Sequence, residues 1–240
     1  MILALVLAGR DLGTGLIIGL IIVLILWFIG TPMRVLVPLG AAAAGLVALL
    51  VYGSGSRMGR IAVFLDPQSN TDLSSQPMSA LYALASGGWW GLGLGASKQK
   101  WGGLKNGAHT DYIFAVIGEE LGLFGCLLVV ALFALLGWAG LEIAMRSDKM
   151  FNRVVAAGIT GWFLVQAIIN IFVVLHLLPV LGVPLPFISS GGSALMASLM
   201  GLGVLLSLAR DTPSARVFLA ARKPKSRPRM TSVMAATKED

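Results

Sequence analysis

The sequence has few charged residues for its length. Only 12% of its 240 residues are charged, whereas 57% are hydrophobic. A soluble domain carries about 25% charged residues, so this composition excludes an ordinary water-soluble protein. The single cysteine, Cys126, lies in an apolar run and excludes a disulfide framework. We therefore expect an all-α, polytopic helical membrane protein, because a helix satisfies its own backbone hydrogen bonds in lipid.

Long apolar runs predict where helices cross the membrane. A spanning helix needs about 20 apolar residues. Five segments approach this length: Leu12–Ile29, Val35–Tyr52, Ile113–Met145, Val154–Leu178 and Ala194–Ala209. The shorter run Ile2–Gly9 resembles the end of a further helix. We therefore expect the chain to be the C-terminal part of a larger membrane protein.

Two segments are more polar than the predicted spans. The interval Gly53–Thr110 contains turn residues and only short apolar pieces, and its tryptophans suit a membrane interface. We predict that it forms a long external loop lying on the bilayer. Residues 211–240 are basic and contain prolines, which predicts a flexible cytoplasmic tail after a membrane domain of residues 1–210.

Basic residues predict the orientation of the helices. If the connections alternate across the membrane, one side receives Arg34, the short segment Arg146–Arg153 and the basic tail. This richer side should be cytoplasmic, which places the interval Gly53–Thr110 outside. The net charge of +7 then reflects membrane topology, and we predict no nucleic-acid partner.

The stretch NGAHTDYIFAVIGEELG, Asn106–Gly122, places carboxylates at the start of an apolar helix. The helix dipole favours an anion at the position of Asp111, and Glu119 shares its helix face. Asp111 is either a functional carboxylate or, with Thr110, a helix cap. Glu119 and Glu120 should face protein or water, as functional groups or as structural partners of a basic residue.

Other polar residues converge on the predicted outer side. Lys98 and Lys100 are candidates for phosphate binding, although lysines also snorkel at interfaces. Prolines and glycines break the helix in Val183–Ser193, which is tolerated inside protein or along a cavity. Gln166 and Asn170 face one way and predict interhelical hydrogen bonds. The sequence shows no metal-ligand spacing, Ser-His-Asp constellation or phosphate loop.

Four motifs resemble the shape, elongation, division and sporulation (SEDS) family, the FtsW, RodA and SpoVE proteins. They are RDLGTGL (Arg10–Leu16), GLGLGASKQKWG (Gly91–Gly102), AHTDYIFAVIGEELGLFG (Ala108–Gly125) and LPVLGVPLPFISSGGSAL (Leu178–Leu195). The SKQKWG element is more similar to FtsW or SpoVE than to RodA. The resemblance covers only the C-terminal portion of the family fold, which has further helices before it.

The resemblance implies a peptidoglycan glycosyltransferase that polymerises lipid II on the outer face of the bacterial cytoplasmic membrane. It also implies a class B penicillin-binding protein and other division or elongation membrane proteins as partners. The family's essential aspartate corresponds to Asp111. The residues predicted to contact substrate are Lys98, Lys100, Arg10, His109, Glu119, Ser189 and Ser193. No cofactor is evident, and a divalent cation is left open.

The chain departs from the family pattern at three places. Arg10 replaces the usual proline before DLGT, LKNGAHTD replaces LPEAHTD, and Ser190 replaces the tyrosine of ISYGGS. Two rival functions also stay open. One is a transporter that flips lipid II through the same polar cavity without making polymer. The other is an inactive truncated remnant that only binds a partner.

Overall fold

The computed structural model describes residues 12–67, 71–104 and 108–222. Within these ranges the regular secondary structure is entirely helical, which confirms the predicted all-α class. The helices are α2 (Leu12–Phe28), α3 (Met33–Tyr52), α4 (Gly55–Leu65), α5 (Thr71–Gly87), α6 (Ile113–Arg146), α7 (Met150–Val174), α8 (Gly192–Arg210) and α9 (Pro213–Arg222).

The five predicted spans are all helical. Four helices of the described part are long and apolar enough to cross a membrane, namely α3, α6, α7 and α8. Helix α2 is equally apolar in character but has 17 residues. The chain is therefore a multi-pass helical membrane protein. The run Ile2–Gly9, predicted to end a further helix, lies outside the described residues.

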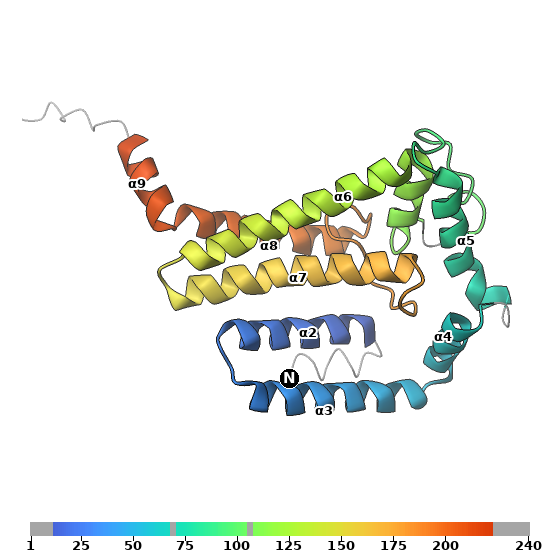
Figure 1. Cartoon of the computed structure of the whole chain (residues 1–240), viewed down its shortest axis with the longest axis horizontal. Helices are drawn as coiled ribbons and strands as arrows, with labels where there is room; N and C mark the ends of the chain where they lie inside the picture. The colour runs from blue at the N-terminus through green and yellow to red at the C-terminus, as the bar shows by residue number, and fades with distance from the viewer. Residues whose placement is uncertain (1–11, 68–70, 105–107, 223–240) are drawn as a thin grey trace, which may run out of the picture.

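Helix α7 is at the centre of the bundle. It packs against α6 on one side and α2 on the other, and it also contacts α8 (Figure 1). Small residues allow the helices to approach closely, as is usual between membrane helices. At Gly140 of α6, for example, a Cβ atom would overlap the hydroxyl of Thr160 on α7.

The alternating helices bring distant segments to one end of the bundle. This end contains the start of α2, the end of α3, the start of α6 and the connection from α7 to α8, with α4 and α5 beside them (Figure 1). The connection from α7 to α8 is not helical between Leu175 and Gly191, as its prolines and glycines predicted. We refer to this end of the molecule as the α4 end.

The interval between α3 and α6 is not a loop throughout, contrary to the prediction. It contains α4 and α5, and α5 packs along α6. Ala80 and Ala83 of α5 are fully buried in the main hydrophobic core. A narrow strip of small residues is sufficient to bury one face of this helix. Such a strip is too short and too weakly apolar to be recognised as a helix signal in the sequence.

The start of the predicted flexible tail is also helical. Asp211 accepts hydrogen bonds from Asn152 at 2.9 Å and from Arg216 at 3.0 Å. These contacts connect the end of α8 to α7 and to the first turns of α9. Residues Pro213–Arg222 are therefore helical rather than irregular, while the flexibility of the tail stays a prediction. Residues 223–240 lie outside the described residues.

Candidate functional site

Asp111 lies directly before α6, at the α4 end of the bundle. Its carboxyl group is half-buried, and a Cβ atom at Gly182 would lie 3.8 Å from its Oδ2. No residue in the described part of the chain donates a hydrogen bond to this carboxylate. The N-cap residue of α6 is Tyr112. Asp111 is therefore not the helix cap that was predicted.

The charge of Asp111 is influenced by Arg60 of α4. Burial raises the pKa of the Asp111 carboxyl, and the Arg60 guanidinium partly opposes this increase. Arg60 also donates a hydrogen bond of 3.4 Å to the carbonyl of Val180. In the sequence, Arg60 is one of several basic residues in the interval Gly53–Thr110. All of α5 separates it from Asp111 along the chain, so no local spacing could have indicated their proximity.

Two amide side chains of α7 hold the site together. Asn170 is 1% exposed, and its Nδ2 donates to the carbonyls of Asp111 at 2.8 Å and Val183 at 2.7 Å. Gln166 donates to the carbonyl of Pro184 at 2.9 Å. The predicted hydrogen bonds between helices are instead bonds to non-helical backbone. They fix the segment before α6 against the connection from α7 to α8.

The segment before α8 is bound to the same region. The carbonyl of His109 accepts hydrogen bonds from the Ser190 amide at 2.9 Å and the Ser190 hydroxyl at 2.8 Å. Ser189 is buried, and its hydroxyl lies 3.5 Å from the same carbonyl. The imidazole of His109 and the side chain of Ser193 are exposed. Ser190, which departs from the family pattern, thus contributes directly to this contact.

The DLGTG motif contacts the same connection. A Cβ atom at Gly13 of α2 would overlap the carbonyl oxygen of Leu181. Glycine is therefore required there for α2 to approach the loop that faces Asp111. Arg10, predicted to contact substrate, lies outside the described residues.

Glu119 has a structural role in the fold. Its carboxylate is 1% exposed and accepts a hydrogen bond of 2.5 Å from Ser97. The amides of Lys98 and Gln99 donate to it at 2.9 Å and 3.3 Å. Glu119 and Glu120 were predicted to face protein or water, and the buried Glu119 confirms this. Its partners are a hydroxyl and backbone amides, rather than the basic residue considered from the sequence.

Lys98 and Lys100 belong to the loop that Glu119 holds. The Lys98 side chain is exposed, and the Lys100 Nζ lies 5.9 Å from the centre of the Trp101 ring. No described contact joins either lysine to Asp111. In the described structure, Arg60 is the cation whose charge lowers the pKa of Asp111.

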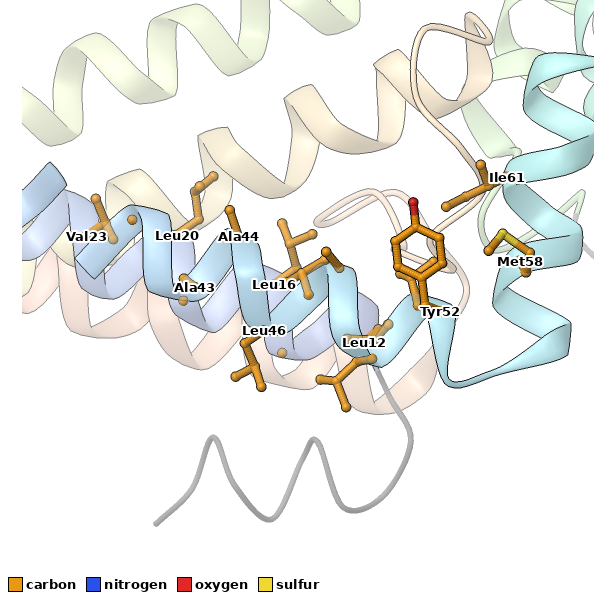
Figure 2. Close-up of a pocket in the computed structure, with 17 residues that line it drawn as sticks. Leu12, Leu16, Leu20, Val23, Ala43, Ala44, Leu46, Tyr52, Met58 and Ile61 are labelled. Carbon is orange, nitrogen blue, oxygen red and sulfur yellow. The ribbon is translucent and has the colours of Figure 1, made fainter. Parts of the chain in front are cut away.

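An apolar groove of about 670 Å³ runs between α2 and α3 (Figure 2). Leu12, Leu16 and Leu20 line it on the α2 side. Met58 and Ile61 of α4 border it at the same end as Tyr52 (Figure 2). The groove therefore extends along the membrane-spanning part of the molecule and reaches the α4 end, where Asp111 and Arg60 lie.

Metal binding by side chains alone has little support in the described residues. They contain no group of three or more His, Cys, Asp or Glu side chains that could hold a metal ion. The site is thus a carboxylate under the electrostatic influence of a cation, at the end of the bundle that the apolar groove reaches. These features define a multi-pass membrane protein with a polar site at one end of its helices.

A protein-family model identifies the family of this chain. Residues 1–214 match the family of cell cycle proteins that comprises FtsW, RodA and SpoVE. The chain belongs to this family, as its four motifs predicted.

Two similar proteins illustrate the relationship. A probable peptidoglycan glycosyltransferase FtsW of Mycobacterium tuberculosis is 43% identical over 220 residues, which cover 91% of this chain and 42% of the relative. Stage V sporulation protein E of Bacillus subtilis is 39% identical over 201 residues, covering 83% of this chain and 55% of the relative. The chain therefore spans about half the length of these relatives.

A solved structure supports the same fold. One chain in a structure of a peptidoglycan synthase complex aligns with a TM-score of 0.71 and 28% identity. The alignment covers 88% of this chain and 59% of that chain.

Proposed function

We propose that this chain forms part of a peptidoglycan glycosyltransferase that polymerises lipid II into glycan strands during division or growth. The observation that carries the proposal is the half-buried Asp111 carboxylate, which no described residue engages in a hydrogen bond. The charge of Arg60 acts on it, and an apolar groove reaches the same end of the bundle. A relative named as a peptidoglycan glycosyltransferase supplies the class of reaction.

In the proposed reaction, a sugar hydroxyl of one substrate attacks the anomeric carbon of the other. A new carbon–oxygen bond forms, and the bond between the anomeric carbon and the diphosphate oxygen breaks. Its electron pair leaves with the polyprenyl diphosphate, and the hydroxyl proton passes to Asp111. A carboxylate within reach of that hydroxyl can act as the general base.

The negative charge of the leaving diphosphate requires a nearby cation. Lys98, Lys100 and Arg10 are proposed for this task from the sequence, and His109, Glu119, Ser189 and Ser193 as further residues of the substrate region. Glu119 would contribute through the Lys98 loop that it holds. A divalent cation would have to be held largely by the oxygens of the diphosphate, because the described residues offer no three-ligand cluster.

We also propose a location and a partner. The α4 end would face outward from the bacterial cytoplasmic membrane, with the C-terminus in the cytoplasm, because the opposite end is richer in Lys and Arg. A class B penicillin-binding protein is the proposed partner, since a structurally similar chain belongs to a peptidoglycan synthase complex. Further division or elongation membrane proteins would join the assembly.

The test is the substitution Asp111→Asn in the complete protein that contains this chain. Loss of a general base costs about 10²–10⁴-fold in rate, so glycan synthesis from purified lipid II should fall by this factor. Membrane insertion and partner binding should persist, because Asn preserves the size of the side chain. The exposed Asp148, at the opposite end of the bundle, provides the matched control, and Asp148→Asn should leave polymerisation unchanged.

Other outcomes would support a rival function. Near-normal polymerisation by Asp111→Asn would contradict the assignment of the base. A complete wild-type protein that moves lipid II across vesicle membranes without forming glycan would identify a transporter. A protein that does neither, but still binds its partner, would be the non-catalytic remnant.

A further inference from the structure

Arg60 has hydrogen-bonding capacity that the described structure does not use. A guanidinium carries five N–H donors, whereas Arg60 donates one hydrogen bond within the described part of the chain, of 3.4 Å from Nη1 to the Val180 carbonyl. No carboxylate in the described part of the chain forms an ion pair with it. Arg57, one turn earlier on α4, instead donates to the Leu50 carbonyl at 2.9 Å and is thereby attached to the end of α3.

Arg60 and Asp111 both approach the connection from α7 to α8. The connection that accepts the hydrogen bond of Arg60 at Val180 also passes Asp111, because a Cβ atom at Gly182 would lie 3.8 Å from Oδ2. A ligand group held by Arg60 would therefore lie near the proposed base. Arg60 is exposed, so such a ligand can reach it.

Arg60 belongs to the helix that borders one end of the apolar groove. Met58 and Ile61 of α4 border the groove (Figure 2), and Arg60 lies between them in the sequence of the same helix. Along its length the groove is bounded by leucines of α2 and by small residues of α3, such as Ala43 and Ala44. A hydrocarbon chain in this groove would place its polar head at α4.

We propose that Arg60 binds the diphosphate of a polyprenyl-linked sugar donor whose hydrocarbon chain occupies the groove between α2 and α3. This inference rests on the proposed function and specifies which cation receives the leaving group. A planar guanidinium matches phosphate oxygens in geometry as well as in charge. Lys98 and Lys100 are less suitable, because Glu119 holds their loop about two helical turns beyond the start of α6.

The experiment measures binding to the complete protein in nanodiscs of zwitterionic lipid. The probes are undecaprenyl diphosphate, uncharged undecaprenol and inorganic diphosphate. Arg60→Gln should weaken binding of undecaprenyl diphosphate by about 10–100-fold, as expected for a lost charge-assisted hydrogen bond. Binding of undecaprenol should not change. Arg60→Lys should lose less affinity than Arg60→Gln, and Arg57→Gln should bind like the wild type. The double variant Lys98→Gln/Lys100→Gln should lose less affinity than Arg60→Gln.

Several results would overturn the inference. One is unchanged binding of undecaprenyl diphosphate by Arg60→Gln, and another is an equal loss of undecaprenol binding. A larger loss in the double lysine variant would transfer the role to that loop. Inorganic diphosphate should bind more weakly than the lipid, because it buries no apolar chain, and equal binding would remove the groove from the proposal. The assay requires no turnover, so failure of the wild type to form glycan would contradict the proposed function separately.

Discussion

The Asp111 carboxyl is subject to two opposing influences. Burial raises its pKa, and the positive charge of Arg60 lowers it. The neighbouring Tyr112 is almost completely buried, and its own pKa is raised by burial and by the Asp111 charge. A general base is active only when it is ionised. For the proposed general base, the charge of Arg60 would therefore extend activity toward lower pH.

This balance predicts a pH effect for Arg60 variants. Removing the positive charge in Arg60→Gln leaves the effect of burial unopposed, so the pKa of Asp111 should rise. The acid limb of the kcat/KM profile for glycan synthesis, which reports the free enzyme, should then move to higher pH. Arg60→Lys keeps the charge and should keep the limb close to the wild-type position. A limb that does not move in Arg60→Gln would show that Asp111 does not sense this cation.

At the scale of elements, α6 is two helical pieces joined at Gly122. This residue has φ 65° and ψ −161°, a conformation that is essentially restricted to glycine. The loop after α5 satisfies the backbone at the break, since the Leu92 amide donates to the Glu119 carbonyl at 2.9 Å. In return, the Leu123 amide donates to the Gly88 carbonyl at 2.9 Å. The break in α6 is thus stabilised by hydrogen bonds to the loop that follows α5.

Gly122→Ala should destabilise this contact strongly. A Cβ atom there would overlap the Gly91 nitrogen and the Trp89 carbonyl group, and the backbone strain adds about 1–3 kcal/mol. The melting temperature of the purified protein should fall clearly. Gly203→Ala on α8 is the control, because its Cβ atom would meet no other atom within 4 Å. Equal melting temperatures for the two variants would contradict the role assigned to the break.

Glu119 holds the other part of the same loop, and this predicts a local effect. Glu119→Gln replaces one acceptor oxygen by an amide that faces the backbone N–H groups of Lys98 and Gln99. A hydrogen bond to a charged group contributes about 1.5–3 kcal/mol. Hydrogen exchange at Lys98 and Gln99 should therefore accelerate by about 10–100-fold, since 1.4 kcal/mol corresponds to a factor of ten.

The comparison for this variant is Glu142→Gln. Glu142 forms a 2.6 Å ion pair with Arg146 in the partly exposed last turns of α6, and surface pairs contribute little. Its substitution should leave exchange at Lys98 unchanged. If the Lys98 amide exchanges as slowly in Glu119→Gln as in the wild type, contacts other than Glu119 hold the loop.

The sequence predicted elements better than it predicted contacts. The five apolar runs are each a local signal, so their helices were found to within a few residues. Asp111 was placed correctly before α6 for the same reason. The end of α7 was predicted four residues too late, because the left-handed backbone of His176, with φ 56°, has no apolar signature. Helix α4 is too short for a span, and α5, although as long as α2, is too weakly apolar to be recognised as one.

The partners of the site residues depend on tertiary structure. Asn170 was recognised as a polar residue that requires a hydrogen bond, but its acceptors are two carbonyls that come from different connections. Arg60 and Asp111 lie on opposite sides of α5 in the sequence. The periodicity of apolar residues cannot predict such contacts, because they form only when the helices pack together.

At the scale of the whole molecule, the helices differ greatly in how much protein surrounds them. In the most apolar part of α7, 50% of the residues are buried, compared with 6% in α3. Helix α7 is therefore the scaffold that holds the Asp111 region through its amides. Helix α3 lies at the edge and forms one wall of the groove (Figure 1). A well-packed centre beside an open apolar groove would suit the proposed lipid substrate.

The orientation of this assembly gives the last prediction. The end opposite α4 contains Arg34, Arg146, Lys149, Arg153 and Arg210, and such an end is retained in the cytoplasm. Ser147 is a poor labelling position because it is buried, and its hydroxyl donates to the Ile143 carbonyl. The neighbouring Asp148 and, on α4, Ser56 are both exposed.

Asp148→Cys and Ser56→Cys should be compared in a complete protein without other cysteines, with Cys126 replaced by Ala. A membrane-impermeant maleimide added to intact cells, with the outer envelope made permeable, should label the cysteine at position 56. The cysteine at position 148 should react only after the cytoplasmic membrane is opened. The reverse pattern would place Asp111 on the cytoplasmic side, where it could not polymerise glycan outside the membrane. Labelling of both positions in intact cells would show that the helices do not alternate as the structure arranges them.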